Sequence, residues 1–260
     1  MMQRKNQLLT NKIYSSYQEA LGLCNDGLGY STLELTEVVV KKNLKYRELI
    51  THNDFLSSDV TRTLLALGPA LNSKSFRVLD FGGGGGYHYT LARHVLEDNC
   101  DIKWNIVETD SMCQSGVAIA DNSLKFFNDI DKAVADLGFV DLILSSSALQ
   151  YCPDPMESLE KLLSVSAKYI YITRTPFFSG KNKLISIQSS MLSHNGPGEL
   201  PSGFEDQEIL YPISFIPLNQ VEKAIKEKYK IRFKVAEDFA NLFIEDQPVN
   251  SYYGFFCELK

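Results

Sequence analysis

A run of five glycines, two acidic residues and a histidine are the groups in this 260-residue chain whose types and spacing point to chemistry. The glycines fill positions 82–86 directly after Asp80-Phe81, and His88 follows the run. Glycine permits positive φ angles, and without a side chain it lets a ligand lie directly on the backbone. Glu108 stands 22 positions after Gly86, where a carboxylate can accept hydrogen bonds from both ribose hydroxyls of a nucleoside. These residues predict a nucleoside-binding site.

The glycine run and the glutamate each have a simpler explanation. A glycine run alone would suit a flexible linker, but a linker is rarely preceded by Val-Leu-Asp and followed at once by a helix pattern such as 87–96. Glu108 would also suit the exposed end of a strand. The order strand, glycine turn and helix favours the ligand site over both alternatives.

The spacing of the glycines separates two classes of nucleotide site. A dinucleotide site needs G-x-G-x-x-G, and no frame of this run supplies it. The run satisfies D-x-G-x-G-x-G, which resembles the first motif of class I S-adenosylmethionine (SAM) methyltransferases. The resemblance implies SAM as cofactor and places these residues at its site: Asp80, Phe81, Gly82, Gly83, Gly84 and Gly86. For Phe81, aromatic packing in the core is the alternative.

Three later segments read as strands whose ends carry polar side chains. Asp129 follows the segment 124–127, Ser145 follows the apolar run 140–144, and Arg174 follows the segment 169–173. Parallel strands bind ligands at their carboxyl ends. The resemblance implies that Asp129 contacts the adenine amino group and that Ser145 lies beside the sulfonium. A turn-forming role is the alternative for Asp129.

The order of these elements predicts an α/β protein with a Rossmann-like class I methyltransferase fold. We expect a seven-stranded, mostly parallel sheet with helices on both faces. Residues 1–70 should form an N-terminal helical segment that caps the core, and residues 71–260 the SAM-binding domain.

The segment 177–217 interrupts this regular pattern. Asn-Gly-Pro-Gly at 195–198 and Pro-Ser-Gly at 201–203 break any helix or strand there, which predicts a lid-like insertion without regular elements. A helix over 218–229 and two final strands should then close the sheet.

Composition narrows the class of protein. The net charge of -6 argues against a broad phosphate-binding surface, so no nucleic-acid partner is expected. The five cysteines contain no C-x-x-C pair, which predicts reduced thiols and no metal site. No apolar segment has the length of a signal peptide or a membrane span, and we expect a cytoplasmic protein.

Further blocks narrow the resemblance. The stretches 80–84, 146–155 and 174–177, together with Gly29-Tyr30, resemble the methyltransferases of the LIC12133 type. This implies methyl transfer to a small molecule, such as a sugar or glycan precursor in surface-polysaccharide biosynthesis. Gly85 departs from the pattern, because it replaces a bulkier residue and could loosen the turn.

Methyl transfer to an oxygen needs a group that removes the acceptor's proton. His88 is the candidate base, and Tyr151 and Arg174 complete the predicted catalytic set. Two of them have an alternative: His88 would also suit a hydrogen-bonded bystander, and Arg174 an ion pair that anchors a loop. Two other functions stay open, namely a non-catalytic partner protein with this fold and a methyltransferase for an unrelated small molecule.

Overall fold

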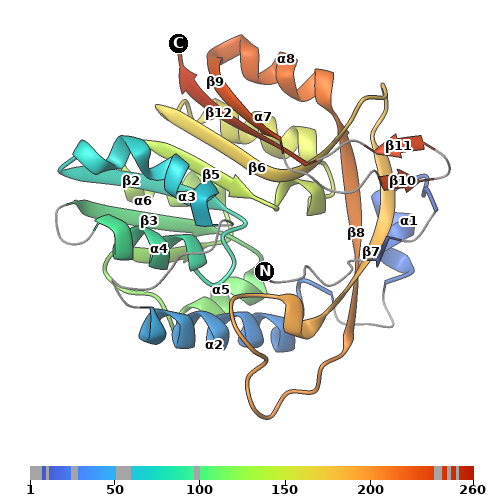
Figure 1. Ribbon diagram of the computed structural model, residues 1–260, viewed down its shortest axis with the longest axis horizontal. Helices are drawn as coiled ribbons and strands as arrows, with labels where there is room; N and C mark the ends of the chain where they lie inside the picture. Colours follow the sequence, from blue (N-terminus) through green and yellow to red (C-terminus); the bar gives the residue numbers. More distant parts are fainter. Residues whose placement is uncertain are drawn as a thin grey trace.

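A parallel sheet organised around the buried strand β2 (Ser75–Phe81) forms the centre of the molecule (Figure 1). The computed structural model describes residues 8–9, 12–24, 29–50, 60–96, 100–236, 242–244, 247–249 and 252–260. β2 pairs in parallel with β3 (Asp101–Val107) on one side and with β5 (Leu142–Ser146) on the other. The chain therefore reverses its direction of winding between β2 and β5, where open α/β sheets bind ligands.

The described residues form a ten-stranded sheet, and seven of its strands make up the central series, in the order β4-β3-β2-β5-β6-β12-β9. The other four are β4 (Leu124–Phe127), β6 (Tyr169–Phe178), β9 (Tyr229–Ala236) and β12 (Tyr252–Leu259). β12 runs antiparallel to both of its neighbours, and the other pairings in this series are parallel. The predicted Rossmann-like, mostly parallel fold is confirmed.

Helices cover both faces of this sheet, as the sequence predicts. One apolar cluster joins β2 and β3 to α3 (Val60–Leu67) and α4 (Tyr87–Leu96). The other cluster packs the opposite face against three helices: α6 (Ile130–Leu137), α7 (Pro155–Ser164) and α8 (Leu218–Lys228). Among the described residues, no helix is both long enough and apolar enough to cross a membrane.

The N-terminal helix α2 (Leu33–Leu49) lies beside the first cluster and contributes Leu35 and Val38 to it. It packs along α5 (Asp110–Gly116), where the hydroxyls of Thr36 and Ser115 are 2.8 Å apart. Of the predicted N-terminal segment, residues 1–7, 10–11, 25–28 and 51–59 lie outside the described residues. The domain division near residue 70 stays a prediction.

Local sequence explains where the elements near the site begin. α7 starts after Asp154, whose Oδ1 accepts hydrogen bonds from the backbone N–H groups of Met156 and Glu157 at 3.0 and 3.1 Å. Pro155 takes the first helical position, where its missing N–H costs nothing. β5 is a short apolar run buried on both faces, as expected for a central parallel strand.

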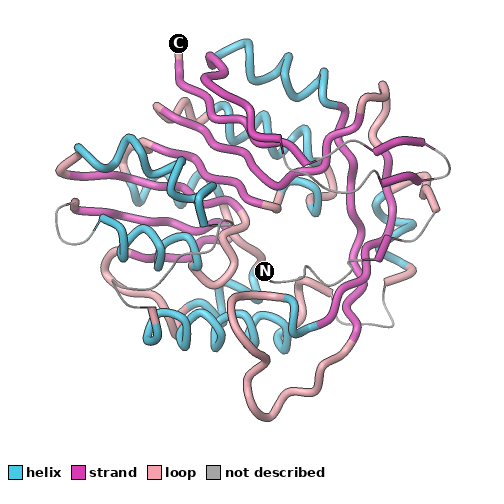
Figure 2. Tube along the Cα trace, viewed as in Figure 1, coloured by secondary structure: helices cyan, strands magenta, loops and turns pink. Residues whose placement is uncertain are grey.

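The prediction that 177–217 lacks regular elements is wrong. β6 continues to Phe178, and β7 (Leu184–Met191) and β8 (Glu208–Pro217) form a long antiparallel hairpin. The Gly/Pro breaks fall in the connection between these strands, which begins with η4 (Leu192–His194). Figure 2 shows the hairpin running across the end of the parallel strands. Whether it acts as a lid stays a prediction.

Short elements flank this hairpin. α1 (Tyr17–Gly22) packs on its outer face, where Ala20 and Cys24 meet Ile185 and Ile187. β1 (Leu8–Leu9) pairs with β7, and β10 (Leu242–Ile244) with β11 (Gln247–Val249). The hairpin itself is joined to the main sheet where β8 pairs in parallel with the end of β6, Phe177 with Ile216 and Phe178 with Pro217.

Candidate functional site

The register of three strands places the predicted residues at one edge of the sheet. Phe81 at the end of β2 lies opposite Val107 of β3 on one side and Ser145 of β5 on the other. The next residues are therefore neighbours, and the Gly82 N–H donates to the Val107 carbonyl at 2.9 Å. The glycine turn, Glu108 and the serines at the end of β5 converge at the carboxyl ends of the strands.

The glycine turn has a backbone that only glycine adopts without strain. Gly82, Gly84 and Gly86 have φ angles of 72°, 55° and 84°. A Cβ on Gly82 would lie 2.2 Å from the Ala148 Cβ, and one on Gly83 would lie 2.5 Å from Asp80 Oδ2. Gly84 has more room, since the nearest atom to its Cβ position is in Val39 at 3.8 Å. The turn therefore keeps an open backbone surface at Gly84.

Glu108 reaches back onto this turn. Its Oε1 accepts a hydrogen bond from the Gly84 N–H, and its Oε2 accepts one from the Thr109 N–H, both at 3.0 Å. Burial raises the pKa of this carboxyl, and the two backbone hydrogen bonds oppose the shift. Each oxygen has a second lone pair, so the carboxylate retains the capacity to accept from two ligand hydroxyls.

Asp80 is fully buried beneath the turn. Its Oδ2 accepts a hydrogen bond from Trp104 Nε1 at 3.0 Å and lies 3.1 Å from His88 Nδ1. Its Oδ1 is buried without a hydrogen-bond partner among the described residues. A buried carboxylate oxygen is costly to leave unpaired, which makes this atom a candidate for contact with a ligand or a water.

The segment after β5 carries strained backbone. Ser147 and Arg174 have φ angles of 59° and 55°, and Gln150 Nε2 donates to the Ser147 hydroxyl at 2.9 Å and to the Arg174 carbonyl at 3.1 Å. Gln150 Oε1 and Ser145 Oγ are buried with no partner among the described residues. Non-glycine residues in the left-handed region cost about 1–3 kcal/mol each and concentrate at functional sites.

Tyr151 links this corner to the β7–β8 hairpin. Its ring centroid lies 5.0 Å from that of Tyr30 and 5.2 Å from that of Tyr211 on β8, and its hydroxyl donates to Gln188 Oε1 at 3.3 Å. Burial raises the pKa of Tyr151, while the Ser147 hydrogen bond and the nearby Arg174 charge oppose the shift. Tyr151 is therefore a neutral phenol near pH 7 whose single O–H donates to Gln188 and whose oxygen can still accept a hydrogen bond.

The inner face of the hairpin is buried and is polar along β7, whereas the β8 partners Ile209 and Ile213 on the same face are apolar. Ser186, Gln188 and Ser190 alternate along β7 on the side of Tyr211, and all three are buried. Ser190 Oγ has no hydrogen-bond partner among the described residues. Buried strand faces are normally apolar, so uncharged polar groups here fit contact with a polar, uncharged ligand.

Three other predicted site residues, Asp129, Phe81 and Arg174, are not held at the glycine turn by any hydrogen bond described above. Asp129 caps α6, its Oδ1 accepts from the Lys132 N–H at 2.9 Å, and its pKa is lowered chiefly by that bond. This is the turn-forming alternative, and contact with adenine stays a prediction. Phe81 packs partly buried against the second apolar cluster. Arg174 is exposed, and no ion pair joins it to another described residue.

Sequence reasoning missed several residues of this edge. Trp104 fixes Asp80, Gln150 holds the strained corner, and Gln188 contacts Tyr151. The alternation of isoleucine with serine and glutamine over 185–190 is a strand signal that could have revealed the hairpin. For Tyr30 the sequence offers only the Gly29-Tyr30 resemblance. No local pattern predicts that Tyr30 contacts Tyr151, which follows it by about 120 residues.

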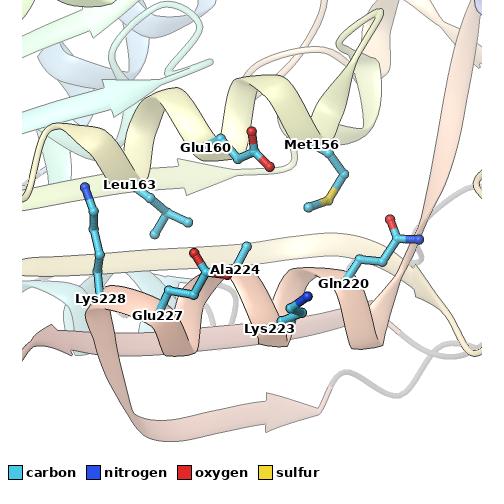
Figure 3. Close-up of a pocket in the computed structure, with 8 residues that line it drawn as sticks. All are labelled: Met156, Glu160, Leu163, Gln220, Lys223, Ala224, Glu227 and Lys228. Atoms are coloured by element: carbon cyan, nitrogen blue, oxygen red, sulfur yellow. The ribbon is translucent and has the colours of Figure 1, made fainter.

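A groove of about 410 Å³ lies elsewhere, between α7 and α8 (Figure 3). Exposed charged residues, among them Glu160, Lys223 and Glu227, line it together with Met156 and Leu163. It contains none of the predicted site residues. Among the described residues, no three His, Cys, Asp or Glu side chains are placed to hold a metal ion.

No family model matches the chain, and no curated protein matches its sequence. A SAM-dependent methyltransferase from Clostridium acetobutylicum overlaps 84% of this chain and 98% of its own, at 14% identity and a TM-score of 0.49. The Burkholderia thailandensis 1,6-didemethyltoxoflavin-N1-methyltransferase, solved with 1,6-didemethyltoxoflavin and S-adenosylhomocysteine, overlaps 100% and 98%, at 10% identity and 0.49.

The [4+2]-cyclase SpnF overlaps 90% of this chain and 97% of its own, at 11% identity and a TM-score of 0.49. These likenesses concern the fold and carry no activity to this chain.

Proposed function

We propose that this protein is a SAM-dependent methyltransferase that methylates an oxygen of a small, uncharged, hydroxylated molecule. The observation that carries the proposal is the position of Glu108, whose carboxylate lies 3.0 Å from the Gly84 N–H beside a glycine turn with three positive φ angles. A carboxylate next to bare backbone suits the ribose of a nucleoside, and the spacing of the glycines suits SAM better than a dinucleotide.

Two buried atoms without hydrogen-bond partners are suited to bind the amino-acid part of SAM. Asp80 Oδ1 and Ser145 Oγ are both buried at the carboxyl ends of neighbouring strands. Such atoms can bind the ammonium and carboxylate groups of an amino acid directly or through water. When bound, SAM supplies a methyl group on a positively charged sulfur, which is electrophilic enough for direct displacement.

The proposed acceptor follows from the chemistry of the β7–β8 hairpin. Ser186, Gln188 and Ser190 offer hydrogen bonds without charge, and Tyr151 and Tyr211 offer ring faces. A sugar or glycan precursor presents hydroxyls and flat C–H surfaces that match these groups. The resemblance to the LIC12133 type supports the same class, with surface-polysaccharide biosynthesis as the proposed pathway and the cytoplasm as the proposed compartment.

His88 is the proposed base. Its Nδ1 lies 3.1 Å from Asp80 Oδ2, and this bond would leave Nε2 to accept the acceptor's proton. Asp80 would then stabilise the imidazolium that forms. The Tyr151 hydroxyl, which donates to Gln188 Oε1, would accept a hydrogen bond from the acceptor, and Arg174 at the strained corner would help to orient it.

Calorimetric titration with SAM, S-adenosylhomocysteine (SAH) and NAD tests the proposal. Hydrogen bonds to a charged acceptor contribute about 1.5–3 kcal/mol each, so Glu108→Ala should weaken SAM binding by about 10-fold to 100-fold or more. Glu157→Ala, at an exposed glutamate on α7, is the matched control and should bind as wild type does. Tight NAD binding without a SAM signal would overturn the proposal, and an unchanged dissociation constant would remove Glu108 from the site.

A further inference from the structure

α2 lies between the glycine turn and the loop that connects β7 to β8, residues 192–207. On the turn side, a Cβ placed on Gly85 would lie 2.6 Å from Asn43 Nδ2 and 3.2 Å from Val39 Cγ1. On the loop side, a Cβ on Gly196 would lie 3.5 Å from Lys42 Cβ and 3.6 Å from Val39 Cα. The missing side chain at Gly85 thus allows the helix to lie directly on the turn.

Lys42 ties the helix to the loop. Its side chain is buried, with 2% of its surface exposed, and its Nζ donates to the Ser193 carbonyl at 2.9 Å. Ser193 is held in turn by Asp206, which accepts from the Ser193 N–H at 2.9 Å and from its hydroxyl at 2.7 Å. Figure 2 shows this loop beside α2.

Burying the charged side chain of Lys42 costs free energy, because the ammonium group loses contact with water. Desolvation lowers the pKa of Lys42, and the charge of Asp206 opposes that shift. A leucine or methionine would pack in the same place without the cost of burying a charge. The gain from the lysine is a directed bond to one backbone carbonyl of the loop, which fixes the position of Ser193 relative to α2.

Two further contacts fasten the loop to the same helix. Gln207 Nε2 donates to Glu34 Oε1 at 2.9 Å, and Lys41 Nζ lies 4.5 Å from the ring centroid of Phe204. Both groups of side chains are exposed or half-buried, so they add little by themselves. Lys42 is the buried member of this set, and it is adjacent to Asn43, which contacts the turn.

We propose that Lys42 is a positioning residue that couples the glycine turn to the β7–β8 loop through α2, so that SAM or SAH bound at the turn orders residues 192–207. This inference rests on the proposed function, because it takes the turn as the cofactor site. By linkage, a ligand that orders the loop is also bound more tightly when the loop is already in place. Binding of the cofactor would thereby fix the position of the β7–β8 hairpin, which faces the proposed acceptor.

Hydrogen exchange with SAH as the probe tests the coupling without knowledge of the acceptor. In the wild type, saturating SAH should slow exchange in 192–207 by about 5-fold or more, the lower end of usual coupling between sites. Lys42→Met keeps the length of the side chain and removes the donor. It should still bind SAH at the turn, while the SAH-dependent protection of the loop falls to less than about 2-fold.

Lys45→Met is the matched control, since Lys45 is exposed on the same helix and should leave the protection as in wild type. Asp206→Ala is a second variant, at an exposed position. It tests the coupling between the turn and the loop if Lys42→Met fails to fold. It releases Ser193 and should also reduce the protection.

The outcomes separate the two proposals. Calorimetry that shows no SAH binding to the wild type overturns the proposed function and the inference together. SAH binding with no slowing of exchange in 192–207 overturns the inference alone. The inference also fails if the protection persists in Lys42→Met or, where that variant does not fold, in Asp206→Ala.

Discussion

The two walls of the candidate site, the glycine turn and the inner face of the β7–β8 hairpin, differ in chemistry although both carry buried polar groups. The glycine-turn wall carries two carboxylates, Asp80 and Glu108, and backbone that only glycine adopts easily. The β7–β8 wall carries serines, a glutamine and tyrosines, and no acid or base on its buried inner face within the described residues. Under the proposed function, charge and bare backbone suit one ligand, a nucleoside with an amino-acid group, whereas neutral hydrogen bonds and ring faces suit another.

Gly84→Val should have the largest effect and should act on the first wall alone. A β-branched residue at a φ of 55° is strained by about 1–2 kcal/mol and fills the space beside Glu108, so we expect no measurable SAM binding in a folded protein. Gly138→Val is the control, because Gly138 has a φ of 76° with nothing within 4 Å of its Cβ position, far from the turn. Normal SAM binding by folded Gly84→Val would show that the turn is not the cofactor site.

His88→Ala should separate chemistry from cofactor binding. Loss of a general base lowers turnover by about 10²–10⁴. The affinity for SAM should stay nearly intact, and His94→Ala on the same helix should leave turnover unchanged. Transfer of labelled methyl from SAM to an acceptor purified from a small-molecule extract is the measurement. If His88→Ala turns over normally, the base lies elsewhere and the pair with Asp80 is structural.

Tyr151→Phe should act on the second wall alone. It removes one uncharged hydrogen bond, worth about 0.5–1.5 kcal/mol, so the KM for the acceptor should rise by about 2-fold to 13-fold. Calorimetry should show the wild-type affinity for SAM. Tyr169→Phe, at the amino end of β6, is the matched control. A Tyr151→Phe variant that loses SAM affinity and keeps its acceptor KM would reverse the roles of the two walls.

Acidification should weaken SAM binding through the first wall, and the loss should be small close to neutral pH. Burial raises the pKa of Glu108, and the protonated acid accepts from the ribose less well than the carboxylate. Affinity should be full above this raised pKa and fall as pH drops through it, by at most about 10-fold per pH unit. Titrations across the acidic range measure this, and Glu108→Gln, which does not titrate, should give a weaker but flat profile.

The glycine-turn wall was largely predictable because its signals are local. Glycine at positive φ, an acidic residue at the end of the next strand and the Asp154-Pro155 start of α7 each reflect the conformation of a few adjacent residues. The register then follows from parallel pairing, which brings Phe81 and Ser145 side by side. Whether these residues bind SAM stays a prediction.

The β7–β8 wall was not predictable from the same kind of signal. β8 contains Pro212 and is buried on both faces, and Gly and Pro in the 192–207 loop made the whole segment read as irregular. Its partners are distant in sequence: Tyr30 precedes it by more than 150 residues, and its outer face is covered by Ala20 of α1 and by Cys24, which follows that helix. Likewise, only the fold reveals that α2 packs directly on Gly85 and leaves no room there for a side chain.

The crystal structure of the protein with SAH bound tests the central claim most directly. The account predicts the adenosine on the backbone of Gly82 to Gly86, with both ribose hydroxyls within hydrogen-bond distance of the Glu108 carboxylate. It also predicts that the sulfur faces the Tyr151 side of the hairpin. SAH seated in the groove between α7 and α8, or ribose hydroxyls with no contact to Glu108, would contradict the account.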